Sequence, residues 1–431
     1  MTKSHITQLA ATMLVLAALA CGFPPPPIRD STPTASAYAP TSSSATATPV
    51  ETPTAPSTKT PTATPTEPTP EHWLPENTLA LVSAGPWERS QLHALTIDGT
   101  LIDLGHPLTP EATVAPSGRW IGSTRSDPPR VVVTNLSDGS SYTINGTADS
   151  QIYGMAFDRP ETRLAFLELG PVSEEGIPWA IVVVDLVDGT TSRFSLEIDI
   201  ADPSMLPGHP LGWSADGSVL LIDTFMPYTE GAWAGVWALT LPPGTASTPI
   251  DSLGRRELIP MGGYLTQPRL SPDGRSLLYL NRDYDYTPAG YEPTAYDLAV
   301  NQLWQADIAS GARTLLVETT DGSALGRSAS WAPAGQRVIY AQGRYAGDTF
   351  ASLTLKRQHP DGMRSDVGPI PLPPQGNLTQ LDWCRPDVAL ITVTTMEGDR
   401  KLHRADLGGE ATRLSIDDQH IAVLTCIQGN S

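Results

Sequence analysis

The residues best suited to bind a ligand lie in one aromatic and acidic segment, residues 281–300. It contains six candidate ligand-binding residues: Asp283, Tyr284, Asp285, Tyr286, Tyr291 and Tyr296. Tyrosine combines a large apolar ring with a hydroxyl group, which suits the recognition of glycans or peptides. The two aspartates could also supply oxygen ligands to Ca²⁺, although no complete EF-hand loop follows them. The competing interpretation is a loop that packs on itself and binds no ligand.

Signals for catalysis are weaker. The segment around Ser214 reads GWSAD and departs from the G-x-S-x-G nucleophile motif at its last glycine. His106 and His209 lie far apart in the sequence, whereas a metal-dependent enzyme needs several such ligands together. The sequence has no H-E-x-x-H, C-x-x-C or phosphate-binding Gly-Lys motif. It therefore favours a non-catalytic protein with no metal or cofactor other than Ca²⁺. A metal-dependent carbohydrate-active enzyme, a lyase or a hydrolase, stays as the alternative.

The N-terminus predicts export and a lipid anchor. Lys3 precedes the apolar run ATMLVLAALA, and this pattern is typical of a signal peptide, here residues 1–20. The tetrapeptide ALAC that ends at Cys21 resembles the lipobox of bacterial lipoproteins, although that family prefers leucine at its first position. The resemblance implies that Cys21 is acylated after cleavage. The alternative is an ordinary secretory signal in which Cys21 has no role.

Residues 21–72 have a composition that cannot form a hydrophobic core. Proline, threonine and serine dominate stretches such as TPTATPTEPTP, which predicts a disordered, extended stalk before a domain at residues 73–431. The formal net charge of the whole chain is −19, which disfavours binding to nucleic acid. We expect the protein in the cell envelope, attached to a membrane by its lipid and facing away from the cytoplasm. The expected partner is a protein, peptide or glycan.

Residues 73–431 contain a repeated unit of a bulky or apolar residue, a short turn and an apolar strand, as in LSPDGRSLLYL. The units begin at residues 73, 114, 157, 213, 270, 331 and 383. A second strand–turn–strand signal follows each unit, with turn glycines at Gly99, Gly139, Gly189, Gly244, Gly311, Gly362 and Gly409. Two hairpins per unit give four antiparallel strands, which is the blade of a β-propeller. The sequence predicts an all-β, seven-bladed β-propeller, with six or eight blades as alternatives.

LSPDGRSLLYL followed by LWQADIASG resembles the PD40, or WD40-like, repeat of the TolB-type propellers. The resemblance covers nearly all of residues 73–431. The same repeat builds the propellers of dipeptidyl peptidase IV and prolyl oligopeptidase, and we expect the likeness to these peptidases to stop at the repeat. TolB itself has six blades and an additional α/β domain. A TolB-like role in envelope assembly is therefore a further alternative rather than the favoured function.

The C-terminal segment predicts how the ring closes. The unit that begins at Trp73 lacks an innermost strand, and the apolar residues 420–427, HIAVLTCI, could supply it and leave no open edge. In this register Cys384 and Cys426 lie near the same end of neighbouring innermost strands. An exported protein permits a disulfide between them, provided that their Cα atoms come within about 4.4–6.8 Å. The alternative is a pair of buried free thiols.

The two faces of the predicted propeller differ. Turns between the first and second and between the third and fourth strands lie on one face, which we call the turn face, and are short. The other connections lie on the opposite face, which we call the loop face, and include residues 196–210, 250–268 and 281–300. Long connections in a compact scaffold are often functional, so we expect binding on the loop face. The favoured function is a surface lipoprotein that presents its propeller as a binding or scaffold module.

Overall fold

The structure, a computed structural model, describes residues 73–427 with internal gaps, and residues 428–431 lie outside the described residues. The gaps are residues 87–88, 110–111, 172–177, 197–205, 226–232, 242–253, 261–265, 284, 293–298, 396, 409–410 and 415–420. All described residues belong to one compact unit, Pro68–Ser431. The predicted signal peptide, Cys21 and the stalk lie outside the described residues. Within the described ranges, no helix is long and apolar enough to cross a membrane.

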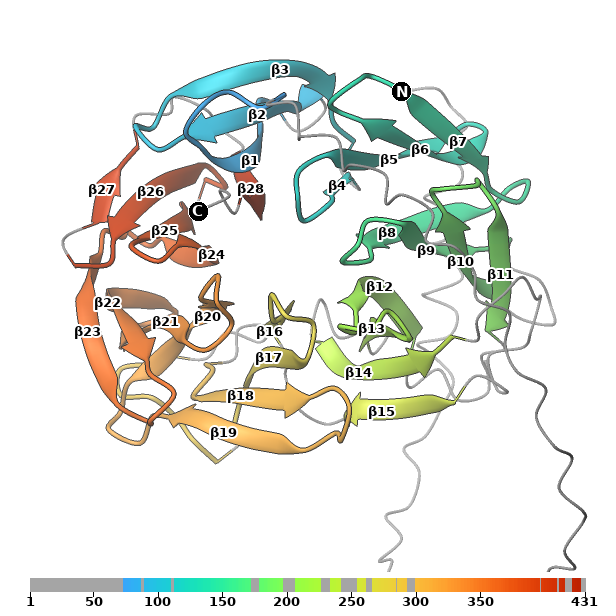
Figure 1. Ribbon diagram of the computed structural model, residues 1–431. Helices are drawn as coiled ribbons and strands as arrows, with labels where there is room; N and C mark the ends of the chain where they lie inside the picture. Colours follow the sequence, from blue (N-terminus) through green and yellow to red (C-terminus); the bar gives the residue numbers. More distant parts are fainter. Residues whose placement is uncertain are drawn as a thin grey trace, which may run out of the picture. The chain divides into compact units, whose positions relative to one another are not determined.

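The regular elements of the described residues are all β-strands, arranged in seven four-stranded antiparallel sheets. The sheets, called blades A to G, stand around a common centre, with β28, β4, β8, β12, β16, β20 and β24 innermost (Figure 1). The prediction of an all-β, seven-bladed propeller is therefore confirmed, and the alternatives of six and eight blades are wrong.

Every blade has the same order of strands, from an innermost to an outermost one. Blade A contains β28 (Ala422–Cys426), β1 (Thr78–Ala84), β2 (Gln91–Thr96) and β3 (Leu101–Pro107). Blade B contains β4 (Thr113–Val114), β5 (Trp120–Ser126), β6 (Pro129–Asn135) and β7 (Ser141–Asn145), and blade C contains β8 (Gln151–Phe157), β9 (Arg163–Leu169), β10 (Trp179–Asp185) and β11 (Thr191–Leu196). Blade D contains β12 (Leu206–Trp213), β13 (Val219–Phe225), β14 (Trp233–Thr240) and β15 (Arg255–Ile259).

The remaining blades follow the same order. Blade E contains β16 (Thr266–Leu270), β17 (Ser276–Asn281), β18 (Gln302–Asp307) and β19 (Arg313–Glu318). Blade F contains β20 (Ala324–Trp331), β21 (Val338–Ala346), β22 (Thr349–Gln358) and β23 (Arg364–Ile370), and blade G contains β24 (Asn377–Arg385), β25 (Val388–Thr394), β26 (Arg400–Asp406) and β27 (Ala411–Arg413).

The hydrophobic core lies between the blades. Seven clusters of buried apolar side chains occur among the described residues, each centred between two neighbouring blades. Leu277 in β17 packs with Leu221 of blade D, whereas the next residue, Leu278, packs with Tyr340 of blade F. Successive side chains of a strand point to opposite faces, so a strand between two blades must be apolar at every position. This explains the continuous apolar runs of the repeat.

Arginine side chains add hydrogen bonds between neighbouring blades. Their guanidinium groups donate to backbone carbonyls of the next blade at 2.7–3.2 Å, in the pairs Arg163–Gly217, Arg357–Leu407 and Arg385–Thr78. Two of these guanidinium groups also lie over indole rings, Arg163 over Trp213 at 4.4 Å and Arg357 over Trp383 at 5.5 Å. Such stacking adds a cation–π attraction to the hydrogen bond.

The C-terminal strand closes the ring. β28 pairs antiparallel with β1, with Ala80 opposite Cys426, and the backbone N of Ile427 donates to Leu79 O at 2.9 Å. The prediction that residues 420–427 supply the innermost strand of the first blade is confirmed. Blade A therefore contains strands from both ends of the described chain.

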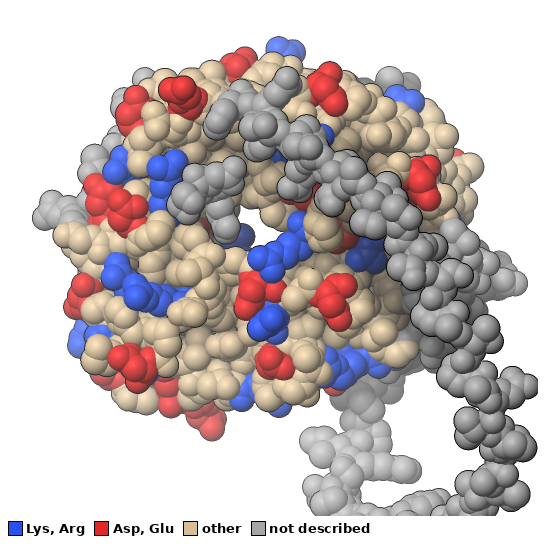
Figure 2. All heavy atoms as spheres, in the orientation of Figure 1, with Lys and Arg blue, Asp and Glu red and all other residues tan. Residues whose placement is uncertain are grey.

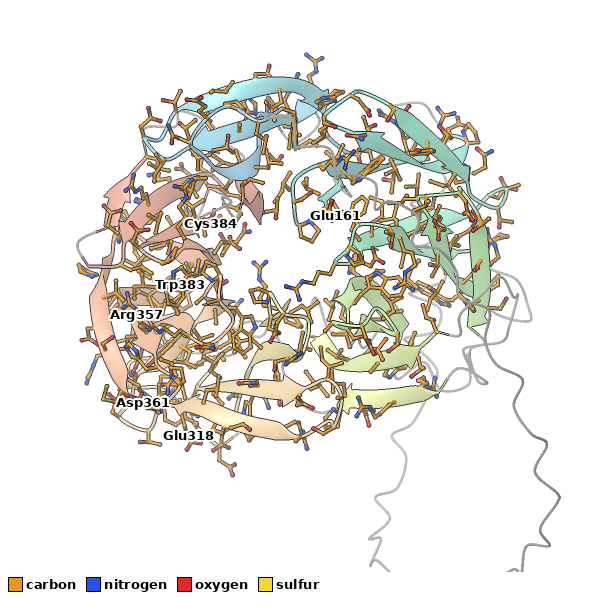
Figure 3. The ribbon with its side chains drawn as sticks, viewed as in Figure 1. Glu161, Glu318, Arg357, Asp361, Trp383 and Cys384 are labelled. Atoms are coloured by element: carbon orange, nitrogen blue, oxygen red, sulfur yellow. A yellow bond between two sulfur atoms is a disulfide. The ribbon has the colours of Figure 1, made fainter. Side chains whose placement is uncertain are left out.

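A disulfide lies beside this closure. Cys384 in β24 and Cys426 in β28 are bonded, with their Cα atoms 4.9 Å apart. Of the two alternatives left open by the sequence, the structure contains the bridge. Cys384 is 1% exposed and lies in the cluster between blades G and A, and it is labelled in Figure 3. The bridge therefore ties the closing strand to the neighbouring blade.

Blade D corrects one expectation. The sequence predicts a tight turn at Gly244 and a fourth strand directly after it, but the fourth strand is β15, Arg255–Ile259. Residues 242–253, including Gly244, lie outside the described residues. Two prolines precede Gly244 and cannot donate ladder hydrogen bonds, whereas Leu258 and Ile259 are buried and give β15 its core contacts. Part of the expected 250–268 loop is therefore strand.

We expect Cys426→Ser to destabilise the propeller. The bridge spans 42 residues of sequence, and its loss frees that segment in the unfolded chain, which costs about 4 kcal/mol in the free energy of unfolding. Denaturant unfolding under non-reducing conditions measures the change, with Thr425→Ser as the control in the same strand. An unchanged unfolding midpoint in Cys426→Ser would show that the bridge does not secure the closure.

Candidate functional site

The turn face is held together by hydrogen bonds between its own turns. Ser117 Oγ donates to Glu161 Oε2 at 2.6 Å and joins blades B and C, and Glu161 is labelled near the centre of the ring in Figure 3. Arg159 Nη1 donates to Asp273 O at 3.4 Å and reaches from blade C to blade E. These polar groups are used within the molecule, which supports a scaffold role for this face.

The Ser-Pro-Asp-Gly turn of blade E has the same character. Ser271 Oγ donates to Asp273 Oδ1 at 2.6 Å and accepts from Ser276 N at 2.9 Å. Gly274 has a φ of +69°, and a Cβ there would lie 2.8 Å from Ala215 N of blade D. Glycine is therefore required both by the backbone conformation and by the contact between blades. The turn positions a neighbouring blade and presents no ligand site.

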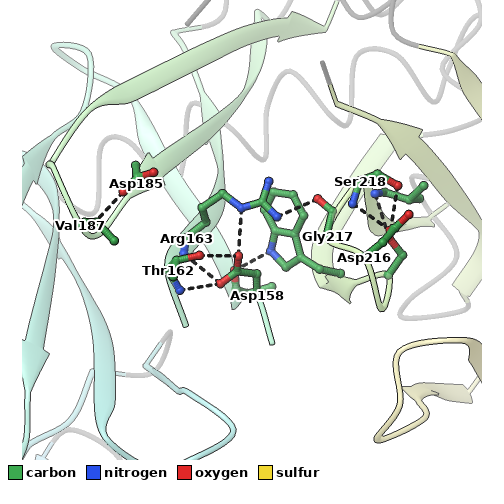
Figure 4. A network of polar contacts seen from close by, with 12 residues as sticks. Asp158, Thr162, Arg163, Asp185, Val187, Asp216, Gly217 and Ser218 are labelled. Atoms are coloured by element: carbon green, nitrogen blue, oxygen red, sulfur yellow. Dashed lines mark hydrogen bonds and ion pairs between the residues drawn. The ribbon is translucent and has the colours of Figure 1, made fainter. Parts of the chain in front are cut away.

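Asp158, a buried acid of the turn face, has hydrogen-bond donors on both of its carboxylate oxygens (Figure 4). It is fully buried and accepts from Thr162 N at 2.8 Å, from Arg163 N at 2.9 Å and from Arg163 Nε at 2.9 Å. Arg163 in turn donates to Gly217 O of blade D at 2.7 Å. Both carboxylate oxygens therefore have donors, so Asp158 is a structural residue.

The predicted ligand-binding loop packs onto blade F. Tyr291 is buried in the core between blades F and G, with its ring centre 4.8 Å from that of Tyr345. The Tyr286 hydroxyl donates to Ser323 O at 2.6 Å. The backbone N of Gly347 donates to Gly290 O at 3.0 Å. The two described tyrosines of the candidate set therefore anchor the loop.

The two aspartates of this loop are exposed to solvent. Asp283 Oδ1 accepts from Asp285 N at 3.1 Å, and Asp283 N donates to Asn301 Oδ1 at 2.8 Å. The other two candidates, Tyr284 and Tyr296, lie outside the described residues. Within the described ranges no group of three or more His, Cys, Asp or Glu side chains is placed to hold a metal ion. Ca²⁺ binding at the aspartates stays a prediction.

The two histidines considered as metal ligands are not brought together. Both lie in strands. His106 is in β3, the outermost strand of blade A, and His209 is in β12, the innermost strand of blade D. They therefore cannot share an ion.

A buried carboxylate lies behind His209. The Asp223 side chain in β13 is 1% exposed, while that of His209 is 45% exposed. One oxygen of Asp223 accepts from the backbone N of His209. The other, Oδ2, lies 3.8 Å from His209 Nδ1 and has no hydrogen-bond partner among the described residues. Burial raises the pKa of Asp223, against the opposing effect of its contacts with His209. Gly154 of blade C leaves room for this imidazole, because a Cβ there would lie 2.9 Å from His209 Cβ.

A second pair of this kind joins blades that are not neighbours. Arg269 Nη1 in β16 lies 3.7 Å from Asp382 Oδ1 in β24, and blade F stands between these two blades. Both residues lie on innermost strands, which border the channel, the hollow at the centre of the ring (Figure 2). Burial raises the pKa of Asp382, and Arg269 and Gln380 oppose the rise. Figure 2 shows basic and acidic side chains together around this hollow.

Sequence reasoning missed Asp223 and Asp382. Each stands in an apolar stretch, VLLIDTF and LDWC, where an ionised side chain is costly unless it has a partner. An acid inside a predicted core strand was the available signal. The cationic partners could not be read from the sequence, because they follow from the register of the strands and from the closure of the ring.

No family model and no curated protein matches the sequence. A puromycin hydrolase is similar in structure, with a TM-score of 0.53 at 13% identity, covering 80% of this chain and 54% of the hydrolase. An acylaminoacyl peptidase has a TM-score of 0.50 at 12% identity, covering 80% and 51%. The chain thus spans about half the length of these two enzymes. A putative TolB from Agrobacterium tumefaciens has a TM-score of 0.38 at 14% identity, covering 66% and 88%.

The chain shares a β-propeller fold with parts of the hydrolase and the peptidase. Identities of 12–13% show the fold alone, so the activities of the hydrolase and the peptidase remain theirs. The candidate site of this propeller is the channel, because the buried carboxylates of the pairs His209–Asp223 and Arg269–Asp382 lie on its innermost strands or beside them.

The turn of blade D predicts a pH dependence of stability. Hydrogen bonds from Ser214 and Ser218 lower the pKa of Asp216 from 3.8 to about 2. A carboxyl group with a lowered pKa stabilises the fold above its unfolded pKa, and this contribution is lost as the pH falls through the folded value. We expect Asp216→Asn to be less stable than the wild type at pH 7, and the difference to shrink between about pH 4 and pH 2. Solvent screening keeps the difference below about 1 kcal/mol.

Urea unfolding at several pH values measures this difference. Asp348→Asn, a change of an exposed aspartate in the β21–β22 turn, is the matched control. A difference for Asp216→Asn that does not vary with pH would contradict the role of its charge.

Proposed function

We propose that this chain is a bacterial envelope lipoprotein that presents a β-propeller as a non-catalytic binding module. Acylated Cys21 anchors it to a membrane, and the Pro/Thr-rich segment holds the propeller away from the lipid. The partner is a protein, peptide or glycan that approaches from the loop face. One observation supports the loop face over the turn face: polar groups of the turn face form hydrogen bonds with neighbouring turns of the same molecule.

Three contacts between blades support this choice. Ser117, Arg159 and Ala215 of the turn face each bond to another blade, so their polar groups serve the ring. On the loop face, Tyr286 and Tyr291 contact blade F, while Asp283 and Asp285 are exposed. Side chains that are already held by such contacts lose less conformational freedom on binding than free ones.

Site-specific photocrosslinking in intact cells tests the binding face. A photoreactive residue replaces Asp285 or Asp348 on the loop face, or Val187 or Met363 on the turn face, all four of which are exposed. We expect crosslinked partners from the loop-face positions and none from the turn-face positions. Equal or stronger crosslinking from Val187 or Met363 would reverse the proposed orientation.

Mass spectrometry of the mature N-terminus tests the anchor. We expect the chain to begin at Cys21 and to carry acyl chains, because the preceding ALA segment places a cleavage site there. In Cys21→Ser, we expect the signal peptide to be retained and the lipid mass to be absent. A mature protein with a free thiol at Cys21 would rule out the lipoprotein assignment while leaving the crosslinking result interpretable.

A further inference from the structure

Blade B carries two arginines directly opposite each other. Arg125 in β5 is the cross-strand partner of Arg130 in β6, and both lie beside the β5–β6 turn, at the loop-face end of the blade. Side chains opposite each other on neighbouring strands lie on the same face of the sheet, with their Cβ atoms about 5 Å apart. The strand register therefore brings these two side chains together at one depth.

Neither guanidinium group has a counter-ion. Within the described ranges, no ion pair or hydrogen bond involves either side chain, and the Nε atom of Arg130 is buried with no acceptor. Asp127, in the turn that joins the two strands, is exposed and is paired with neither arginine. Like charges directly opposite each other destabilise a sheet. The fold leaves this repulsion uncompensated, in a protein whose net charge is −19.

The two arginines belong to a polar row that crosses three strands. Asn145 in β7 is the cross-strand partner of Arg130 on its other side. In β5, Ile121 packs in the cluster between blades A and B, and Arg125 follows it by four residues in regular register, so the row is on the side of the blade turned toward blade A. Arg125 and Asn145 are exposed, and Arg130 is half-buried. With strands about 4.8 Å apart, the row spans about 10 Å.

An oxyanion has the chemistry that this row lacks. A guanidinium group presents a planar fork of N–H donors that matches the oxygens of a carboxylate or a phosphate. An anion between two guanidinium groups replaces their mutual repulsion with attraction to both. The side-chain amide of Asn145 supplies a further N–H donor beside them.

We propose that Arg125 and Arg130 form an oxyanion-binding site, which takes a carboxylate or phosphate group of a ligand at the loop-face end of blade B. Asn145 extends the site toward the outer edge of the blade. The proposal deepens the binding role of the loop face and rests on that role for its biological partner. Binding of the anion itself depends neither on the lipid anchor nor on the result of the crosslinking experiment.

Titration of the purified full-length chain, labelled with ¹⁵N in its arginines, tests the site. Nuclear magnetic resonance follows the Nε–H signal of each arginine while malonate, inorganic phosphate or the neutral control malonamide is added. We expect malonate or phosphate to shift the Arg125 and Arg130 signals saturably, and malonamide to leave them unchanged. Saturation by malonate alone assigns the site to carboxylates, and saturation by phosphate alone assigns it to phosphates. Failure of both anions to saturate these signals would overturn the site and leave the crosslinking test of the loop face unaffected.

Variants of the two arginines test where the anion binds. We expect Arg125→Gln and Arg130→Gln each to weaken anion binding by about tenfold, the effect of losing a hydrogen bond from a charged donor. Arg125→Lys keeps the charge and loses the planar fork, so it should recover only part of the affinity. The matched control is Arg344→Gln, which removes the same charge from an exposed position of blade F and should leave binding unchanged. Equal weakening by this control would show a general effect of net charge and overturn the site.

Urea unfolding of the same variants separates binding from a structural role. Because Arg125 repels Arg130 across the strands, we expect Arg125→Gln without anion to be at least as stable as the wild type. A lower unfolding midpoint in Arg125→Gln would show that this arginine serves the fold and would contradict the proposal. Saturating anion should raise the midpoint of the wild type more than that of Arg125→Gln, since a ligand of the folded state stabilises it. If Arg130→Gln fails to fold, Arg125→Gln and Arg125→Lys decide the proposal.

Discussion

The pairing of β1 with β28 joins strands from the two ends of the described chain in one sheet, and the other blades depend on it. Each blade is apolar on both faces and must be covered by a neighbour on each side. An open ring would expose the clusters on either side of the break to water. β28 completes blade A, and the Cys384–Cys426 bridge holds that strand against blade G. The closure therefore secures all seven interfaces at once.

Closure of the ring also decides which positions are apolar and which are polar. Side chains between blades are apolar, and the polar groups of the turn face bond to one another. The innermost strands are different, because one side of them borders the channel. His209, Arg269 and Asp382 all lie on such strands, and Asp223 lies on the strand next to His209. The ring thus places polar side chains from separate repeats around its centre.

Much of the fold could be predicted because its signals are local. The hairpin at Gly274 and the apolar run after it occupy a few residues, and their recurrence counts the blades. The strand at β15 was misplaced because a pair of prolines separates it from its hairpin partner. The channel pairs were out of reach for another reason: Arg269 and Asp382 belong to different blades, and only the geometry of the ring brings them together. Tyr291 was predicted to bind a ligand. Its ring instead contacts Tyr345 of blade F, and this contact also depends on how the ring places neighbouring blades.

The contact between Ala80 and Cys426 has a consequence for the order of events during synthesis. The N-terminal residues of a chain emerge from the ribosome first, and domains generally fold as they become available. Here the first blade waits for one of the last strands, so six blades can assemble while β1 still has a free edge. An unpaired edge is a template for pairing with other chains, and contacts between distant residues form slowly. The final strand therefore ends the period in which the nascent domain is most exposed to misassembly.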